Sequence, residues 1–199
     1  MKTKVIGITG SISVGKSTVT NYLLQKGYVV LDADMISHHA LDIGTTCYER
    51  VKVVFGCVSD DQTINRQQLG QIVFHNQEKK KQLEEIIHPY VIDELKKGIQ
   101  ETKETIIFLD IPLLYETHLE YLCDQVLVVY VSEDIQAERL MKRNRIDRQS
   151  AIHLMQQQIS IEKKKELADY VIDNSKGLDE LYENIEKVLK ELRNEIVFK

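Results

Sequence analysis

Cysteine is scarce in this 199-residue chain, and its pattern excludes two kinds of stabilising site. The three cysteines, Cys47, Cys57 and Cys123, are odd in number and widely spaced, and they form no CxxC pair. Neither a disulfide framework nor a cysteine zinc site is therefore indicated. A chain of this length buries roughly 70% of its unfolded surface and needs no such cross-link to fold. Reduced, structural thiols are typical of a cytoplasmic protein, and we expect that location.

Long apolar runs are also missing. No segment approaches the ~18 consecutive apolar residues of a membrane helix, and the run before Gly10 is too short for the core of a signal peptide. The formal net charge of −5 argues against general affinity for nucleic acid. These absences argue against a membrane or nucleic-acid partner, and no obligatory protein partner is evident.

Short apolar runs alternate with segments of helical spacing. Helical spacing marks 17–25, which Gly27 follows in the place of a C-cap glycine, and 178–193. Such alternation predicts an α/β fold with a parallel sheet flanked by helices. The runs typical of buried parallel strands are 4–9, 28–32, 105–110, 125–131 and 170–173.

The section of about 35–103 is mostly helical in pattern and contains no convincing strand. It is too long for one crossover helix. We therefore interpret it as a helical insertion in the α/β fold.

A phosphate-binding motif follows the first predicted strand. Gly10 begins the run GSISVGKS, which fits GxxxxGK[ST] at every fixed position and opens a predicted helix. Glycines let the backbone N–H groups converge on an anion, and the helix N-terminus adds partial positive charge. Lys16 is expected to reach the β and γ phosphates of a nucleotide, and Ser17 to offer a hydroxyl to Mg²⁺. Thr18 either touches a phosphate or lies in the first helical turn.

Three aspartates lie at the carboxyl ends of predicted strands. Asp32 and Asp34 follow the second strand, and Asp110 ends the third. In a parallel sheet these ends share one edge with the phosphate loop, where ligands bind. An in-line phosphoryl transfer needs a group that orients or deprotonates the accepting hydroxyl, and carboxylates suit that role. The alternative for each aspartate is a helix N-cap or a turn.

Arginine is rare but clustered. Four of the seven arginines fall between Arg139 and Arg148, and Arg139 and Arg143 share a helix face. Beside a phosphate loop, the cluster is interpreted as a lid that closes over ATP; the alternative is a solvated charged helix. The predicted organisation is one domain with a core of about 1–34, 104–135 and 168–199, the insertion of about 35–103, and a lid of about 136–167.

A GTPase is disfavoured. Asn144 begins the sequence NRID, which superficially matches the guanine-reading NKxD, but it lies inside the arginine cluster and not directly after a strand. A DxxG switch motif is also missing after Asp110, which is followed by IPLL. The small size, the insertion and the arginine lid favour a kinase for a small molecule.

The remaining motifs resemble the dephospho-CoA kinase family, and the resemblance runs from Val5 to about Asn174. The HP at 88–89 followed about twenty residues later by D-x-PLLxE is the most discriminating combination. The segments that carry the resemblance are GITGSISVGKSTV, GYVVLDADMIS, INRQQLGQIVF at 64–74, IIHP at 86–89, LDIPLLYE at 109–116, the arginine cluster and ADYVIDN at 168–174.

The resemblance implies a P-loop kinase that moves the γ-phosphate of ATP to the ribose 3′-hydroxyl of dephospho-CoA, giving coenzyme A and ADP, with Mg²⁺ as cofactor. It implies that Asp34 orients or deprotonates that hydroxyl. The insertion would then hold dephospho-CoA, although His88 could equally be a packed histidine beside a turn proline. The implied catalytic residues are Asp34, Lys16, Arg139 and Arg143. The implied ATP-binding residues are Ser13, Val14, Gly15, Lys16, Ser17, Thr18, Arg143 and Arg148. The implied substrate-binding residues are Asp32, Asp34, Arg66, His88 and Asp110. The implied metal ligand is Ser17, with Asp32 or Asp110 acting through water.

The phosphate loop departs from the family pattern, which is close to GGIGSGKS. Ser11, Ser13 and Val14 stand where glycine, glycine and serine are common. None is a fixed position of the general motif, so nucleotide binding is expected to survive. If Ser13 adopts a positive φ, it carries strain that glycine would avoid. Two other hypotheses stay open: a kinase of the same architecture with another small acceptor, and a nucleotide-dependent switch with slow hydrolysis.

Overall fold

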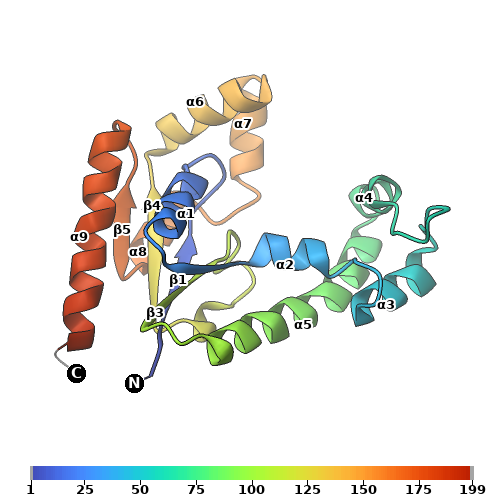
Figure 1. Ribbon diagram of the computed structural model, residues 1–199. Helices are drawn as coiled ribbons and strands as arrows, with labels where there is room; N and C mark the ends of the chain where they lie inside the picture. The colour runs from blue at the N-terminus through green and yellow to red at the C-terminus, as the bar shows by residue number, and fades with distance from the viewer. Residues whose placement is uncertain (1, 198–199) are drawn as a thin grey trace. The chain divides into compact units, whose positions relative to one another are not determined.

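The computed structural model describes residues 2–197, and Figure 1 shows its helices and strands. Five strands form one parallel sheet in the order β2-β3-β1-β4-β5. β1 lies at the centre, paired with β3 on one side and β4 on the other. The strands are β1 (Lys4–Thr9), β2 (Val29–Asp32), β3 (Ile106–Asp110), β4 (Gln125–Tyr130) and β5 (Tyr170–Asp173).

The chain separates into two compact units, which are described one at a time. The first unit runs to Leu31 and resumes at Thr102, and the second is Asp32–Glu101. Helices of the first unit are α1 (Lys16–Gln25), the 3-10 helix η1 (Glu120–Leu122), α6 (Glu133–Asn144), α7 (Arg148–Met155), α8 (Ile161–Leu167) and α9 (Leu178–Val197). Those of the second are α2 (Ala33–His39), α3 (Thr46–Phe55), α4 (Arg66–Phe74) and α5 (Gln77–Glu101).

The predicted α/β fold is confirmed, with all five expected strands within one residue of their predicted bounds. The sequence signal was strong because β1 and β3 are buried almost throughout, so each is a continuous apolar run. Gly27 follows α1 with φ at 85°, the left-handed conformation that a glycine after a helix supplies. In residues 2–197, no helix is both long and apolar enough to cross a membrane.

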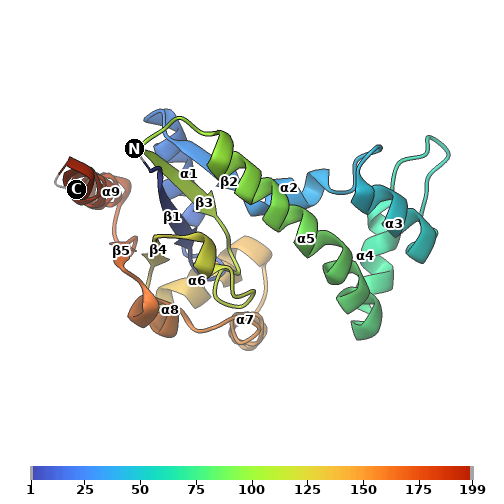
Figure 2. The same cartoon turned by 90° about the horizontal axis from the view of Figure 1, so that it is seen from below.

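The second unit packs around its own apolar core. α5 is its longest helix, and α2, α3 and α4 all contact it (Figure 2). The buried residues of this core are Ala40, Leu41, Cys47, Tyr48, Val51, Cys57, Ile64, Leu69 and Ile86. Apart from the bridge between Val58 and Ile64, its described structure is helical, as the pattern of residues 35–103 indicated.

Candidate phosphate-binding site

The loop between β1 and α1 has the backbone that a phosphate-binding nest requires. Ser13 and Gly15 both have positive φ, at 63° and 89°. α1 begins directly after Gly15, so its first N–H groups and its positive dipole end lie beside the loop. The strain expected at Ser13 is therefore present. Its hydroxyl is also buried, and no hydrogen-bond partner for it exists within residues 2–197.

Glycine at position 15 is required both by its positive φ and by the close approach of Asn174. A Cβ atom there would lie 2.2 Å from Nδ2 of Asn174, a distance that real side chains do not tolerate. The same Nδ2 atom donates a hydrogen bond of 2.8 Å to the carbonyl of Val14. The loop and the end of β5 are thus in direct contact, and only a residue without a side chain allows it.

Lys16 and Asp110 meet in the first unit. Lys16 Nζ forms an ion pair with Asp110 Oδ1, and Asp110 is only 4% exposed. Lys16 is the first residue of α1, and Asp110 is the last residue of β3, the strand paired with β1. The sheet thus joins the loop lysine to one of the three predicted carboxylates. Such a lysine can turn from the carboxylate to phosphate oxygens when a nucleotide enters.

The other loop residues named from the sequence lie around this pair. Val14 is buried, and its carbonyl accepts hydrogen bonds from Asn174 and Arg139. Ser17 is exposed in the first turn of α1. Thr18 lies in the same turn, and its N–H donates to the carbonyl of Gly15 at 3.0 Å.

The three arginines assigned to the predicted lid have different environments. Arg139 is half-buried and donates to the carbonyls of Val14 (3.3 Å) and Asn174 (2.8 Å), so it braces the loop. Arg143 is exposed and donates to its neighbour Asn144 at 3.1 Å. Arg148 pairs with Asp134 at 2.5 Å, which links the starts of α7 and α6. Arg143 is thus the arginine of the three that no carboxylate or loop carbonyl holds within the described chain.

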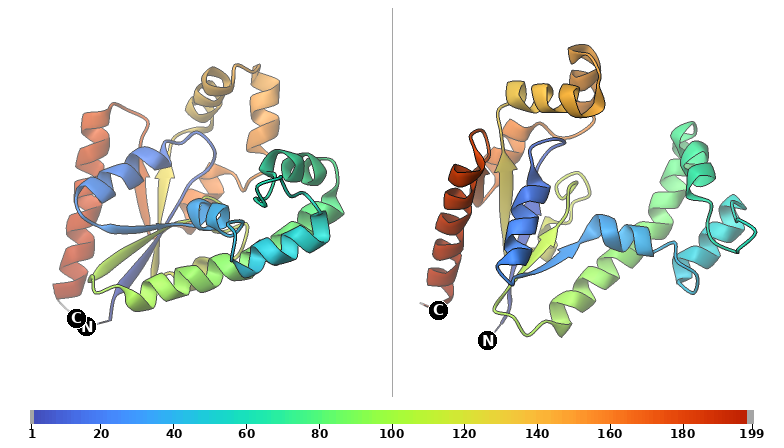
Figure 3. Two further views of the ribbon diagram at one scale, coloured as in Figure 1. Left: turned by 45° about the vertical axis from the view of Figure 1, so that its right-hand side comes forward. Right: turned by 45° about the horizontal axis from the view of Figure 1, so that its top comes forward.

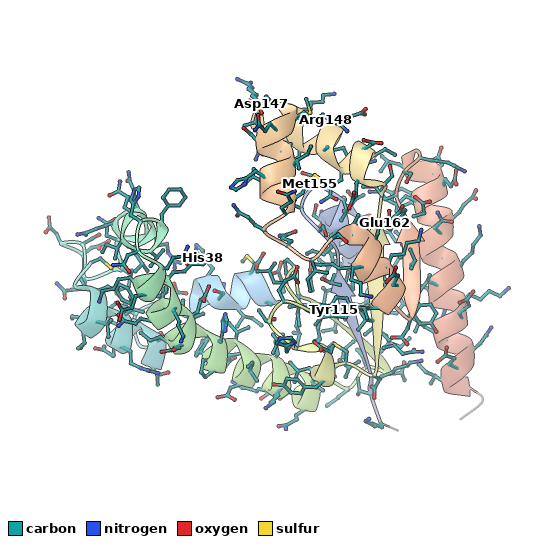
Figure 4. All side chains as sticks on the ribbon, turned by 180° about the vertical axis from the view of Figure 1, so that it is seen from behind. His38, Tyr115, Asp147, Arg148, Met155 and Glu162 are labelled. Carbon is teal, nitrogen blue, oxygen red and sulfur yellow. The ribbon has the colours of Figure 1, made fainter. Side chains whose placement is uncertain are left out.

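α6 and α7 contact each other, and they are the gold and orange helices in Figure 3. Asp147 and Arg148 lie at the start of α7 and Met155 at its end (Figure 4). A cavity of about 420 Å³ lies beside these helices, and Ser11 of the phosphate loop lines it together with Arg148 and Gln158. Asp147 caps α7 by accepting from the N–H of Ser150 at 2.7 Å, which agrees with an accidental match to NKxD.

The remaining predicted residues belong to the second unit. Asp32 is the N-cap of α2, where its Oδ1 accepts from the N–H of Met35 at 3.0 Å, so the capping alternative applies to it. Asp34 is exposed in the first turn of the same helix. His88 is exposed, and Pro89 lies inside α5, so the alternative of a packed histidine beside a turn proline is wrong.

Arg66 begins α4 and is held by the end of α2 and the residues after it. Its Nη2 donates to the carbonyl of His38 (2.9 Å) and to Asp42 Oδ1 (3.3 Å). Asp42 Oδ2 also forms a hydrogen bond of 2.7 Å with His39 Nδ1. This bond holds the pKa of Asp42 below its usual range. Figure 4 labels His38 within this cluster.

Sequence reasoning assigned no role to five side chains that contact the loop or its supports: Gln136, Gln158, Asn174, Glu116 and Lys164. Glu116 and Asn174 fall inside motifs that carried the family resemblance. Lys164 stands in the run KKK, which looks like a solvated surface. The signal that could have found it is its spacing, because Lys164 lies three residues after the apolar Ile161 on the buried face of α8.

Comparison with known proteins agrees with this geometry. The sequence model of a family described as dephospho-CoA kinase matches residues 4–180. The dephospho-CoA kinase of Oceanobacillus iheyensis is 42% identical over 193 residues, covering 94% of this chain and 97% of that relative. The one from Bacillus licheniformis is 43% identical over 192 residues, covering 94% and 96%.

Solved structures give the same result. The dephospho-CoA kinase of Campylobacter jejuni superposes with a TM-score of 0.75 at 29% identity, covering 94% of this chain and 96% of that one. A shikimate kinase from Bacteroides thetaiotaomicron, at 11% identity and a TM-score of 0.54 over 96% of this chain and 98% of its own, shares the fold alone.

Proposed function

The chain belongs to the dephospho-CoA kinase family and catalyses the final step of coenzyme A biosynthesis, and from this premise we propose how its residues carry out the reaction. The proposal assigns ATP to the loop between β1 and α1, and the 3′-hydroxyl of dephospho-CoA as the accepting group. The observation that carries it is the strained loop that presents Lys16 at the N-terminus of α1, opposite Asp110.

On the nucleotide side, the loop N–H groups from Ser13 to Thr18 and the start of α1 surround the phosphates. Lys16 leaves Asp110 and neutralises the β and γ phosphates. Arg143 and Arg148 approach the γ-phosphate from the lid, after Arg148 leaves Asp134. Arg139 acts on the same charge while it keeps its hydrogen bonds to the loop.

On the acceptor side, Asp34 orients the 3′-hydroxyl and takes its proton. The hydroxyl oxygen forms a bond to the γ-phosphorus, and the bond from that phosphorus to the β,γ-bridging oxygen breaks. ADP leaves with the bond's electron pair, and the proton on Asp34 passes to solvent. Asp32, Arg66, His88 and Asp110 are the proposed contacts to the rest of dephospho-CoA.

Mg²⁺ fits the donors that this site offers. Within residues 2–197, no group of three or more His, Cys, Asp or Glu side chains is arranged to hold a metal on its own. That agrees with an ion held by one protein hydroxyl, phosphate oxygens and water, and Ser17 offers the hydroxyl. Asp32 or Asp110 would act through water. When bound, the ion neutralises charge on the transferring phosphate.

The proposal also places the enzyme in the cytoplasm, acting on a small molecule without a nucleic acid or obligatory protein partner. The experiment that tests it follows ADP release by the purified chain with ATP and Mg²⁺, with and without dephospho-CoA. AMP, CMP and shikimate serve as comparison acceptors. Release that requires dephospho-CoA, with coenzyme A as product, supports the proposal. Release with another acceptor alone refutes the substrate, and release that no acceptor changes indicates a switch.

Lys16→Ala tests the nucleotide assignment. Loss of the ammonium is expected to lower turnover by about 100-fold or more, because nothing else replaces its charge on the β and γ phosphates. Lys26→Ala, just after the other end of α1, is the matched control and should keep full activity. Normal turnover in Lys16→Ala would exclude the phosphate loop as the ATP site.

A further inference from the structure

A fully buried lysine lies in α8, near the end of the predicted lid of about 136–167. The side chain of Lys164, in α8, is 0% exposed, and its Nζ lies 2.8 Å from Glu116 Oε1. The same Nζ donates to the carbonyl of Pro112 at 3.2 Å. Burial lowers the pKa of Lys164, Glu116 raises it, and the charge of Lys16 lowers it, with a net downward shift. Lysine is almost never buried without such a partner.

The ion pair is not explained by stability. Burying both charges costs about as much as their attraction returns, and a well-packed apolar pair is often equally stable. Glu116 also keeps an unsatisfied atom: its Oε2 is buried, and within residues 2–197 no donor reaches it. An arrangement with these costs suggests that the pair does more than hold the fold together.

Glu116 holds the segment that holds the phosphate loop. Its Oε1 accepts from the N–H of Ile159 at 3.0 Å. The carbonyl of Ile159 accepts from Ser11 Oγ at 3.2 Å, and Gln158 Oε1 accepts from the N–H of Ile12 at 2.8 Å. Two consecutive loop residues are therefore fixed by Gln158 and Ile159, and Glu116 holds Ile159.

Lys164 holds the opposite side of the same loop. The carbonyl of Pro112, which accepts from Lys164, also accepts from Thr9 Oγ1 at 3.0 Å. Thr9 is the last residue of β1, directly before Gly10. Tyr115 adds a bond of 3.1 Å from its hydroxyl to the carbonyl of Leu167 at the end of α8, the helix that carries Glu162 in Figure 4. Two residues of α8, Lys164 and Leu167, are thus bound to the segment 112–116 that follows β3.

We propose that Glu116 and Lys164 are positioning residues for phosphoryl transfer, which hold the phosphate loop and the segment 158–164 together as one unit. The inference rests on the proposed function. In this proposal the pair affects the reaction rate through the position of bound ATP. A displacement of about 1 Å at reacting groups costs about 100-fold in rate. Glu116 acts through Ile159, Ser11 and Ile12, and Lys164 acts through Pro112 and Thr9.

The test compares Glu116→Gln and the double variant Glu116→Gln, Lys164→Met with the wild-type chain. Lys163→Met is the matched control, because Lys163 lies on the same helix, is 58% exposed and pairs with Glu166. Three readouts are needed: the Kd for MgATP from calorimetry, kcat with both KM values, and the thermal unfolding midpoint. The kinetics are measured well below that midpoint.

The expected result separates geometry from stability. In the double variant, Kd and KM for ATP rise and kcat falls, each by about tenfold, while KM for dephospho-CoA stays within about twofold. The midpoint changes by only a few degrees, because an ion pair has been replaced by groups of similar volume. Glu116→Gln shows a smaller change in the same direction, and Lys163→Met shows none.

Wild-type Kd and kcat in both Glu116 variants would overturn the proposal. So would an activity loss that vanishes on cooling, because it would only report unfolded enzyme. If the double variant does not fold, Glu116→Gln decides alone, with a threefold change in the Kd for ATP as the threshold. If the wild-type chain does not use dephospho-CoA, the proposed function fails, whereas the calorimetric comparison still tests the pair.

Discussion

Replacing Ser13 by glycine is expected to stabilise the chain, although most substitutions destabilise proteins. Ser13 has φ at 63°, and a residue with a Cβ in the left-handed region carries strain of roughly 1–2 kcal/mol. Its buried hydroxyl has no partner among the described residues, which adds about 1 kcal/mol or more. Glycine removes both costs, and its greater freedom in the unfolded chain takes back about 1 kcal/mol. The net gain is about 1–2 kcal/mol.

Thermal unfolding of the nucleotide-free chain measures this gain. For a chain of this size, about 1–2 kcal/mol corresponds to a rise of roughly 2–8 °C in the midpoint. Ser13→Ala separates the two contributions, because it removes the hydroxyl and keeps the strained Cβ. Its gain should be about 1 kcal/mol, the contribution of the hydroxyl alone.

Ser11→Ala is the matched control in the same loop. The Ser11 hydroxyl donates to the carbonyl of Ile159, so its loss should lower stability by about 1 kcal/mol. A midpoint for Ser13→Gly at or below that of the wild type would refute the reasoning. A gain for glycine about 1 kcal/mol smaller than the gain for alanine would show that the backbone at Ser13 stores no strain, because only the greater freedom of glycine in the unfolded chain would then separate the two variants.

Three further predictions concern other parts of the chain. Gly15→Ala should lower the unfolding midpoint and abolish ATP binding in calorimetry, because its φ is 89° and the new Cβ would meet Asn174; an unchanged midpoint would contradict this. Asp34→Asn should lower kcat by about 100-fold or more and change the Kd for ATP by less than about twofold, because its role lies in the transfer step; near wild-type kcat would assign the base elsewhere. Burial raises the pKa of Asp124, but the hydrogen bond from the N–H of Val5 and the interaction with Lys2 together lower it by more. The net shift of the pKa is downward. Its stabilising effect is therefore complete above the unfolded pKa of about 3.9 and is lost as the pH falls through the lower folded pKa. Asp124→Asn should flatten the fall in urea midpoint between about pH 5 and pH 2, and parallel curves for both proteins would exclude this role.

The sequence predicted well those elements that are marked by a pattern of residue types along the chain, such as an apolar run or a motif. A strand such as β3 is buried along its whole length, so its apolar run marks both of its ends. The left-handed Ser13 was also within reach of the sequence, because the motif places it where glycine is common. Lys16 followed from the same motif.

The supports of the loop had no such signal. Asn174 lies 160 residues from the Val14 carbonyl that it holds, and Glu116 lies 43 residues from Ile159. Their partners are backbone atoms, which leave no pattern of residue types to recognise. Arg139 shows the same limit: its spacing predicted a residue of the lid, whereas its hydrogen bonds brace the loop.

The central place of β1 has a consequence for how the chain folds as it is synthesised. β1 is the first strand made, yet its neighbours are β3 and β4, and Lys4 pairs with Ile106, about one hundred residues later. The helical unit in between draws its core from one continuous stretch, so it can collapse while β1 still has no partner. At ribosomal speeds β1 therefore waits at least several seconds for β3. The phosphate loop acquires its shape only after the helices that precede β3 have been completed.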